Sequence, residues 1–161
     1  MKKNLILIII FYFIFIISSY GAGSGAGAGS TDYYKKAISL VKRAKKLEKK
    51  GKIEKANKRY EKALQYLIKS NKKKPNQPDT LNYLGFTTRK LGDFENGEKY
   101  YLEGLAIEPN HIGINEYLGE LYVSTNRINL AKDRLKVLEN CNCEEYNELK
   151  EIIDGTKKSK Y

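Results

Sequence analysis

The stretch "LNYLGFTTRKLGDFENGEKYYLEGLAIEPN", from Leu81 to Asn110, decides which fold this chain adopts. It contains no His and no Cys, yet its glycines and aromatic residues fall at regular intervals among helix-forming residues. A unit that buries its apolar face only against copies of itself must keep the same residue types at the same offsets. The regular intervals therefore predict further copies of this unit along the chain.

Copies occur on both sides of the stretch in a frame of 34 residues. With Pro78 at position 1, positions 7, 8, 15, 17, 20, 24 and 27 are held by Leu84, Gly85, Gly92, Phe94, Gly97, Tyr101 and Gly104. One frame later, the same positions hold Leu118, Gly119, Asn126, Ile128, Ala131, Leu135 and Leu138. The frame that starts at Ala37 holds Arg43, Ala44, Gly51, Ile53, Ala56, Tyr60 and Ala63. Seven extra residues, 71–77, follow this first copy.

This pattern resembles the tetratricopeptide repeat, which has Leu-Gly at 7 and 8, small residues at 8, 20 and 27, an aromatic residue near 24 and Pro near 32. The resemblance covers residues 37 to about 145. It implies helix-turn-helix units in which the small residues let neighbouring helices approach closely. Gly51, Gly92 and Asn126 share position 15, in the turn between two helices, where a positive φ is expected.

The predicted fold is all-α: a right-handed helical solenoid of about three such units with a C-terminal capping helix. Prolines interrupt the helical pattern only where helices have to stop, and no sustained strand pattern occurs. Arg43 at position 7 and Cys143 at position 32 depart from the repeat pattern. The expected boundaries are a domain over residues 32–155, repeats at about 37–70, 78–111 and 112–145, a cap helix at 144–154, and a disordered basic tail at 156–161.

The first thirty residues differ in composition from the rest. Lys2 and Lys3 precede 13 consecutive apolar residues, Leu5–Ile17, and small residues suited to cleavage after Gly21 follow. This predicts a signal peptide over residues 1–21, with an uncleaved membrane anchor as the alternative. Residues 22–31 follow as a tether rich in Gly, Ala and Ser. On either interpretation the domain is expected to be exported, to the periplasm, the cell envelope or the outside of the cell.

Positive charge is concentrated in the first repeat. Residues 31–77 contain 17 Lys or Arg and 4 Asp or Glu, whereas residues 78–161 contain 11 and 15. A basic segment of this kind attracts anionic surfaces, although lysine-rich helices are also simply well solvated. Export and the lack of interleaved exposed aromatic residues argue against nucleic acid, so an anionic membrane surface is the favoured partner of this charge.

Few residues could support catalysis. Spacing places no Ser, Asp or Glu beside His111, so this histidine is interpreted as a surface turn residue. Cys141 and Cys143 are separated by one residue and would allow a strained disulfide, a bond to a second chain, or a metal site with His111 that lacks a fourth ligand. We expect no enzyme activity, no cofactor and no metal, and oligomers through Cys141 or Cys143 stay open.

The family resemblance implies a protein-interaction module that holds a peptide or partner protein in a concave groove, lined by the first helix of each unit. The concave positions of the family correspond here to Lys45, Lys49, Asn82, Phe86, Arg89, Lys90, Glu116 and Glu120. The groove is expected to run from positive to negative, with Phe86 as an aromatic anchor and an acidic part of the peptide near the cations. Position 6 holds Lys42, Tyr83 and Tyr117, which do not match the carboxylate clamp of chaperone-tail binders. The structural alternative is that the basic first repeat docks on an anionic membrane or polymer surface.

Overall fold

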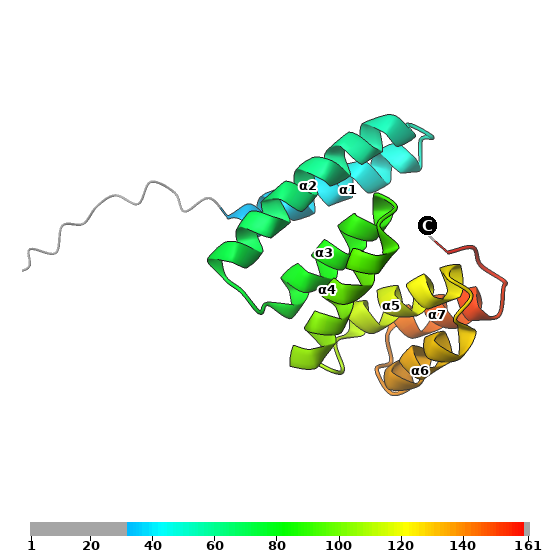
Figure 1. Ribbon diagram of the computed structural model, residues 1–161. Helices are drawn as coiled ribbons and strands as arrows, with labels where there is room; N and C mark the ends of the chain where they lie inside the picture. Colours follow the sequence, from blue (N-terminus) through cyan, green and yellow to red (C-terminus); the bar gives the residue numbers. More distant parts are fainter. Residues whose placement is uncertain (1–31, 160–161) are drawn as a thin grey trace, which may run out of the picture. The chain divides into compact units, whose positions relative to one another are not determined.

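The computed structural model describes residues 32–159, and within this range the chain forms seven α-helices and no strand (Figure 1). In chain order the helices are α1 (Tyr33–Glu48), α2 (Ile53–Lys73), α3 (Pro78–Lys90), α4 (Phe94–Ile107), α5 (Ile112–Ser124), α6 (Ile128–Leu138) and α7 (Glu144–Ile153). The described residues belong to one compact unit with its own hydrophobic core. The expected signal peptide and tether lie outside the described residues. None of these seven helices combines the length and the apolar content needed to cross a bilayer.

Successive helices pack against each other in pairs: α1 with α2, α3 with α4, and α5 with α6 (Figure 1). Each pair contacts the next, because α2 packs against α3 and α4 packs against α5. The last helix, α7, packs against both α5 and α6. The all-α helical-repeat fold predicted from the 34-residue frame is therefore confirmed. Helix α2 continues to Lys73 and so takes in the first of the extra residues after the first copy.

The turns inside the three pairs share one backbone feature. Gly51, Gly92 and Asn126, which occupy the same repeat position, have φ values of +68°, +92° and +58°. Glycine adopts this conformation without a steric penalty, and asparagine tolerates it better than most residues. In each turn the following residue donates its backbone N–H to a carbonyl five residues earlier: Lys52 to Leu47 at 2.9 Å, Asp93 to Thr88 at 3.2 Å, and Arg127 to Tyr122 at 2.7 Å. These bonds close the carboxyl end of the first helix of each pair.

Small residues let helices approach closely in the second and third repeats. A Cβ added at Gly85 would lie 2.5 Å from Cε1 of Tyr101, and one at Gly119 would lie 2.5 Å from Cδ2 of Leu149. Tyr101 and Leu149 are both fully buried. Leu149 belongs to α7, so the capping helix packs on the close-approach position of the third repeat. A Cβ at either glycine would require the neighbouring helix to move.

We expect Gly85→Leu to lower the free energy of unfolding by about 1 to 3 kcal/mol or more, because the new side chain would overlap the buried ring of Tyr101. Thermal unfolding followed by circular dichroism would measure this. Ala106→Leu is the matched control, since Ala106 is exposed on α4 and has room for a larger side chain. Equal thermal midpoints for the two variants would contradict the close packing of α3 on α4.

Candidate functional site

A cavity of about 520 Å³ opens beside α1, α3 and α7. Its lining residues are Lys45, Glu48, Lys49, Phe86, Lys90 and Glu148. Four of them, Lys45, Lys49, Phe86 and Lys90, belong to the groove predicted from the sequence. Glu148 comes from the capping helix, where the 34-residue frame no longer applies, so the sequence carried no signal for it. The cavity thus combines three ammonium groups and two carboxylates around one aromatic ring.

Phe86 forms the floor of this cavity and is also part of the hydrophobic core. Its side chain is 1% exposed, and its ring centroid lies 5.2 Å from that of Tyr117 and 6.0 Å from that of Tyr60. Lys45 Nζ lies 4.4 Å from the Phe86 centroid, within the range of a cation–π interaction, and donates a hydrogen bond of 3.3 Å to Tyr117 Oη. Phe86, expected as the aromatic anchor of the groove, is therefore a residue packed in the core. The helical phase placed it on the correct helix but could not set its depth.

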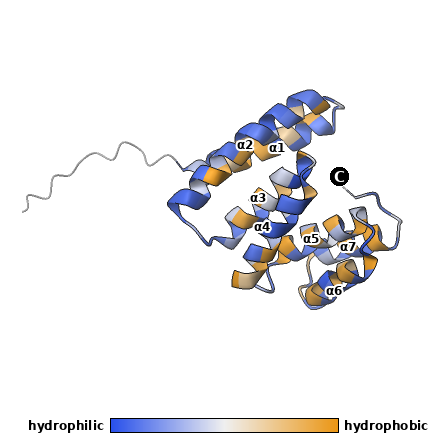
Figure 2. Ribbon diagram, viewed as in Figure 1, coloured by the Kyte–Doolittle hydropathy of each residue, from blue (hydrophilic) through white to orange (hydrophobic). Residues whose placement is uncertain are grey.

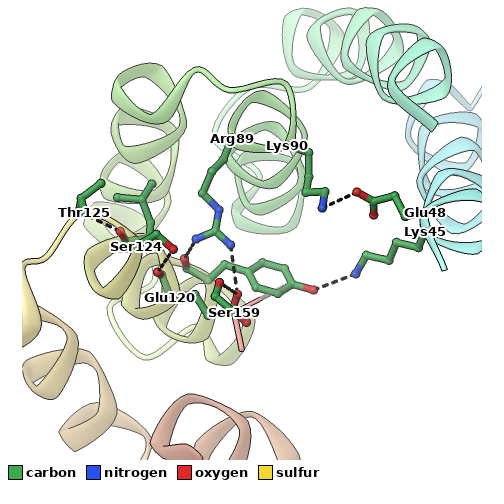
Figure 3. A network of polar contacts seen from close by, with 10 residues as sticks. Lys45, Glu48, Arg89, Lys90, Glu120, Ser124, Thr125 and Ser159 are labelled. Atoms are coloured by element: carbon green, nitrogen blue, oxygen red, sulfur yellow. Dashed lines mark hydrogen bonds and ion pairs between the residues drawn. The ribbon is translucent and has the colours of Figure 1, made fainter. Parts of the chain in front are cut away.

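A hydrogen-bonded group joins α1, α2 and α3 at one wall of the cavity. Lys90 Nζ lies 2.6 Å from Glu48 Oε1 (Figure 3). Tyr60 donates a hydrogen bond of 2.7 Å to Glu48 Oε2. Burial, and secondarily the bond to Glu48, raise the pKa of Tyr60 well above its usual value. Tyr60 therefore remains a neutral donor at physiological pH. Glu48 on α1 is thus bound by groups on α2 and α3.

The second polar group lies deeper, between α3 and α5. Arg89 Nη2 lies 3.4 Å from Glu120 Oε2, and both side chains are fully buried. Arg89 Nη1 donates a further hydrogen bond of 2.6 Å to the carbonyl of Tyr117 (Figure 3). Arg89 thus lies inside the molecule and not on the groove surface where the sequence placed it. Arg89 therefore has a structural role: its guanidinium group joins α3 of the second repeat to α5 of the third.

The remaining predicted groove residues differ in exposure. Asn82 on α3 and Glu116 on α5 are buried, at 6% and 4% exposed, whereas Lys49 is exposed at the rim. The structure therefore brings Lys45, Lys49, Phe86 and Lys90 together at one cavity and buries the other four predicted residues. The family positions identify helix faces that meet a neighbouring unit. Whether such a face stays open depends on how closely the units approach, and the sequence pattern does not report this.

The segment after α7 turns back toward the groove instead of fraying. Gly155 has φ +74°, and beyond it Thr156 and Lys157 donate their backbone N–H groups to the carbonyl of Glu151, at 3.0 and 3.1 Å. Lys157 Nζ then lies 3.0 Å from Glu148 Oε1, and Ser159 donates a hydrogen bond of 3.1 Å to Glu120 Oε2. The described part of the expected disordered tail, residues 156–159, is therefore bound to α7 and α5.

Solved tetratricopeptide-repeat domains share this arrangement of helices. The first TPR of Spaghetti (RPAP3), solved bound to the HSP90 peptide SRMEEVD, is 22% identical, with a TM-score of 0.53 over 76% of this chain and 94% of that one. The first TPR domain of the human RPAP3 protein is also 22% identical, with a TM-score of 0.55 over 78% and 98%. At this identity the likeness is one of fold.

Family models match two parts of the sequence. The tetratricopeptide repeat model matches residues 79–111, the region of α3 and α4. Residues 79–111 thus match the tetratricopeptide repeat, and the described chain has the fold of tetratricopeptide-repeat domains. A model of the MIT (microtubule interacting and transport) domain matches residues 34–85, which span α1, α2 and the first part of α3. The tetratricopeptide repeat model thus matches the second repeat, at residues 78–111. No curated protein matches the chain in sequence.

His111 has a structural role at the start of α5. It is the N-cap of α5, where its Nδ1 accepts the backbone N–H of Ile114 at 3.1 Å. Its Nε2 lies 3.4 Å from Asp79 Oδ1, a carboxylate that sequence spacing had not placed beside it. The partner comes from the start of α3, one repeat earlier. The histidine therefore fastens the amino end of α5 to the preceding unit.

Cys141 and Cys143 are bonded to each other in the turn before α7, with their Cα atoms 5.2 Å apart. The bridge expected as one alternative is the one that forms, and neither cysteine carries a free thiol. A covalent dimer through either cysteine would require this bond to exchange first. Among residues 32–159, no three His, Cys, Asp or Glu side chains are grouped so that they could hold a metal ion.

Proposed function

We propose that residues 31–161 form a protein-interaction module that holds an extended peptide in the groove of α1, α3 and α7. The observation that carries this proposal is the cavity of about 520 Å³, with an aromatic floor at Phe86 and charged groups around it. The RPAP3 repeat domain of the same fold was solved with a peptide, which supports a peptide as the class of ligand. A concave site with an apolar floor and a few charged groups is the usual form of such a site.

The charges around the cavity specify the ligand further. Lys45 lies on α1 and Lys49 directly follows that helix, whereas Glu148 lies on α7. A peptide with an acidic residue near Lys49 and a basic or hydroxyl residue near Glu148 would complement both. Position 6 of the second and third repeats holds Tyr83 and Tyr117, so this site is not proposed to be a carboxylate clamp. We propose no catalytic role for it.

Peptide selection would test this proposal. Peptides selected from a random displayed library on residues 31–161 should bind more weakly to Lys49→Glu, and their association should depend on salt, because Lys49 is a rim charge. Lys62→Glu is the matched control: Lys62 is equally exposed, but it lies on α2 and away from the cavity. Selected peptides that bind both variants as they bind the parent domain would contradict the groove assignment.

We also propose that the domain is exported, which the leader sequence supports. The mass of the protein recovered from cells that express the full chain would test this. A polypeptide beginning at Ala22 would support the signal peptide, and an intact chain in the membrane fraction would support the anchor. An intact chain in the cytosol would overturn both.

A second candidate function, docking on an anionic membrane, is favoured by a basic cavity along α1. A cavity of about 460 Å³ there is lined by Tyr34, Lys35, Ile38, Ser39, Lys42, Arg43 and Lys46, with no acidic residue among them. Figure 2 shows how strongly hydrophilic residues predominate along α1 and α2. Apolar Tyr34 and Ile38 side chains amid cations would suit a headgroup region.

Vesicle sedimentation would test this candidate. Residues 31–161 should sediment with vesicles of mixed phosphatidylserine and phosphatidylcholine at low salt, and the triple variant Lys42→Glu, Arg43→Glu, Lys46→Glu should not. The control triple variant Lys55→Glu, Arg59→Glu, Lys62→Glu changes the net charge equally on exposed positions of α2. Equal loss in both triple variants would show that only net charge matters, which contradicts docking through α1.

A further inference from the structure

The segment that follows α7 is held by several contacts with the folded domain. The turn at Gly155 reverses the chain, and the Thr156 side chain adds a hydrogen bond of 3.1 Å to the Glu151 carbonyl. Lys157 Nζ lies within 3.0 Å of Glu148 and 3.6 Å of Glu151. Ser159 donates to Glu120, whose side chain is fully buried. A segment without a preferred position would not combine a helix-terminating turn, ion pairs and a bond to a buried carboxylate.

These contacts place the segment on the groove itself. Glu148, the partner of Lys157, lines the cavity together with Lys45 and Phe86. Glu120, the partner of Ser159, is also bound to Arg89, which joins α3 to α5 (Figure 3). Figure 3 shows Ser159 beside Glu120 and Arg89. Arg89 also donates to the backbone carbonyl of Tyr117, whose hydroxyl accepts a hydrogen bond from Lys45. The segment therefore engages Glu148, the cavity carboxylate that a basic part of a peptide would contact, and also reaches the buried Glu120.

We propose that residues 156–159 form a built-in occupant of the acidic side of the groove, which a peptide partner has to displace. The inference rests on the proposed peptide-binding function. It also names the chemistry that this side of the groove accepts, namely a lysine followed two residues later by a hydroxyl side chain. A partner carrying such a pair would replace the contacts of Lys157 and Ser159 one for one.

Tethering makes this competition effective even though the contacts are few. A segment joined directly to α7 is present at an effective concentration of the order of millimolar. A separate peptide with the same contacts and a Kd of about 0.1 mM would then bind the full domain about tenfold more weakly than a domain that lacks the segment. The expected signature is therefore a gain of binding when the segment is removed.

The experiment compares residues 31–161 with a domain that ends at Thr156, which keeps the turn at Gly155. The probe is a fluorescein-labelled peptide of residues 155–161, GTKKSKY, followed by fluorescence anisotropy. The shortened domain should bind the probe saturably, about tenfold more tightly than residues 31–161. Equal binding by the two domains, or binding by neither, would overturn the proposal. Circular dichroism and thermal midpoints establish that both are folded.

Two substitutions in residues 31–161 test the same proposal without shortening the domain. Lys157→Glu places a carboxylate beside Glu148 and should raise probe binding by residues 31–161 toward that of the shortened domain. Lys158→Glu is the matched control, because Lys158 is exposed and makes no ion pair with the residues described. A probe peptide with Lys157→Glu should not bind the shortened domain, whereas a probe peptide with Lys158→Glu should still bind it. Equal effects of Lys157→Glu and Lys158→Glu would show attraction by net charge alone, which contradicts the specific site.

The outcomes also separate this inference from the function on which it rests. Library-selected peptides that need Lys49 but bind the full and shortened domains equally would leave the groove function intact and overturn only the built-in occupant. Loss of the Lys49 dependence would overturn the peptide-binding function itself. Self-association of residues 31–161 that disappears on truncation at Thr156 would place the segment in the groove of a second copy and so contradict occupation within one chain.

Discussion

Replacing Arg89 with Met is expected to lower the free energy of unfolding of residues 31–161 by about 3 to 5 kcal/mol. The Glu120 carboxylate is fully buried and would lose the guanidinium 3.4 Å away, while the Tyr117 carbonyl would lose its donor at 2.6 Å. A charge buried without this compensation is far more costly than the pair itself is stabilising. Urea unfolding followed by circular dichroism would measure the change.

Arg127→Met is the matched control for this prediction. Arg127 makes a shorter pair with Glu98, at 2.7 Å, but their side chains are 36% and 21% exposed. Water can replace a partner at that exposure, so the control should cost much less despite its better geometry. Adding Glu120→Gln to Arg89→Met should recover part of the stability, because it removes the stranded charge. If Arg127→Met lowered the free energy of unfolding more than Arg89→Met, burial would not be what determines the cost of losing an ion pair.

Phe86→Ala is expected to cost about 3 to 5 kcal/mol of stability, because it removes a ring that is 1% exposed and packs against Tyr60 and Tyr117. The Lys45 ammonium group would also lose the ring that it lies above. Phe94→Ala is the matched control at the first residue of α4, where the side chain is 38% exposed. Chemical unfolding would measure the loss of stability in both variants. Similar losses for the two would show that Phe86 is not a core residue.

This prediction changes how the groove should be probed. A variant that unfolds the domain reports nothing about a ligand, so Phe86→Ala cannot serve as a binding variant. Arg89 is excluded for the same reason. Lys49 is suitable, since it is exposed at the cavity rim and its replacement disturbs no core contact. The groove is thus best examined through its rim charges.

The helix pairs and their turns could be predicted from the sequence because their causes are local. Side chains repeat every 3.6 residues along a helix, so a fixed frame determines which faces meet. The positive φ at Gly51, Gly92 and Asn126 follows from the few residue types that tolerate it. The close packing at Gly85 and Gly119 follows from the absence of a Cβ. Each of these features depends on residue types within one unit or its immediate neighbour.

Only the tertiary structure decided which groove residues are open to solvent. The frame assigned Phe86, Arg89 and Glu120 to the concave face, but the approach of α1, α3 and α5 buries all three. Their depth depends on the distance between repeats, and this distance is set by the side chains of two units together and not by either alone.

The sequence by itself determined an all-α repeat fold, its turns and its basic first unit. The tertiary structure decided that Glu148 lines the cavity and that Ser159 binds Glu120, since both residues come from segments outside the 34-residue frame. No period relates these segments to the repeats, so their positions depend on long-range packing against α5 and α6 and on the turn at Gly155. A repeated pattern specifies contacts between like units, whereas contacts at the end of the array arise once and leave no period in the sequence.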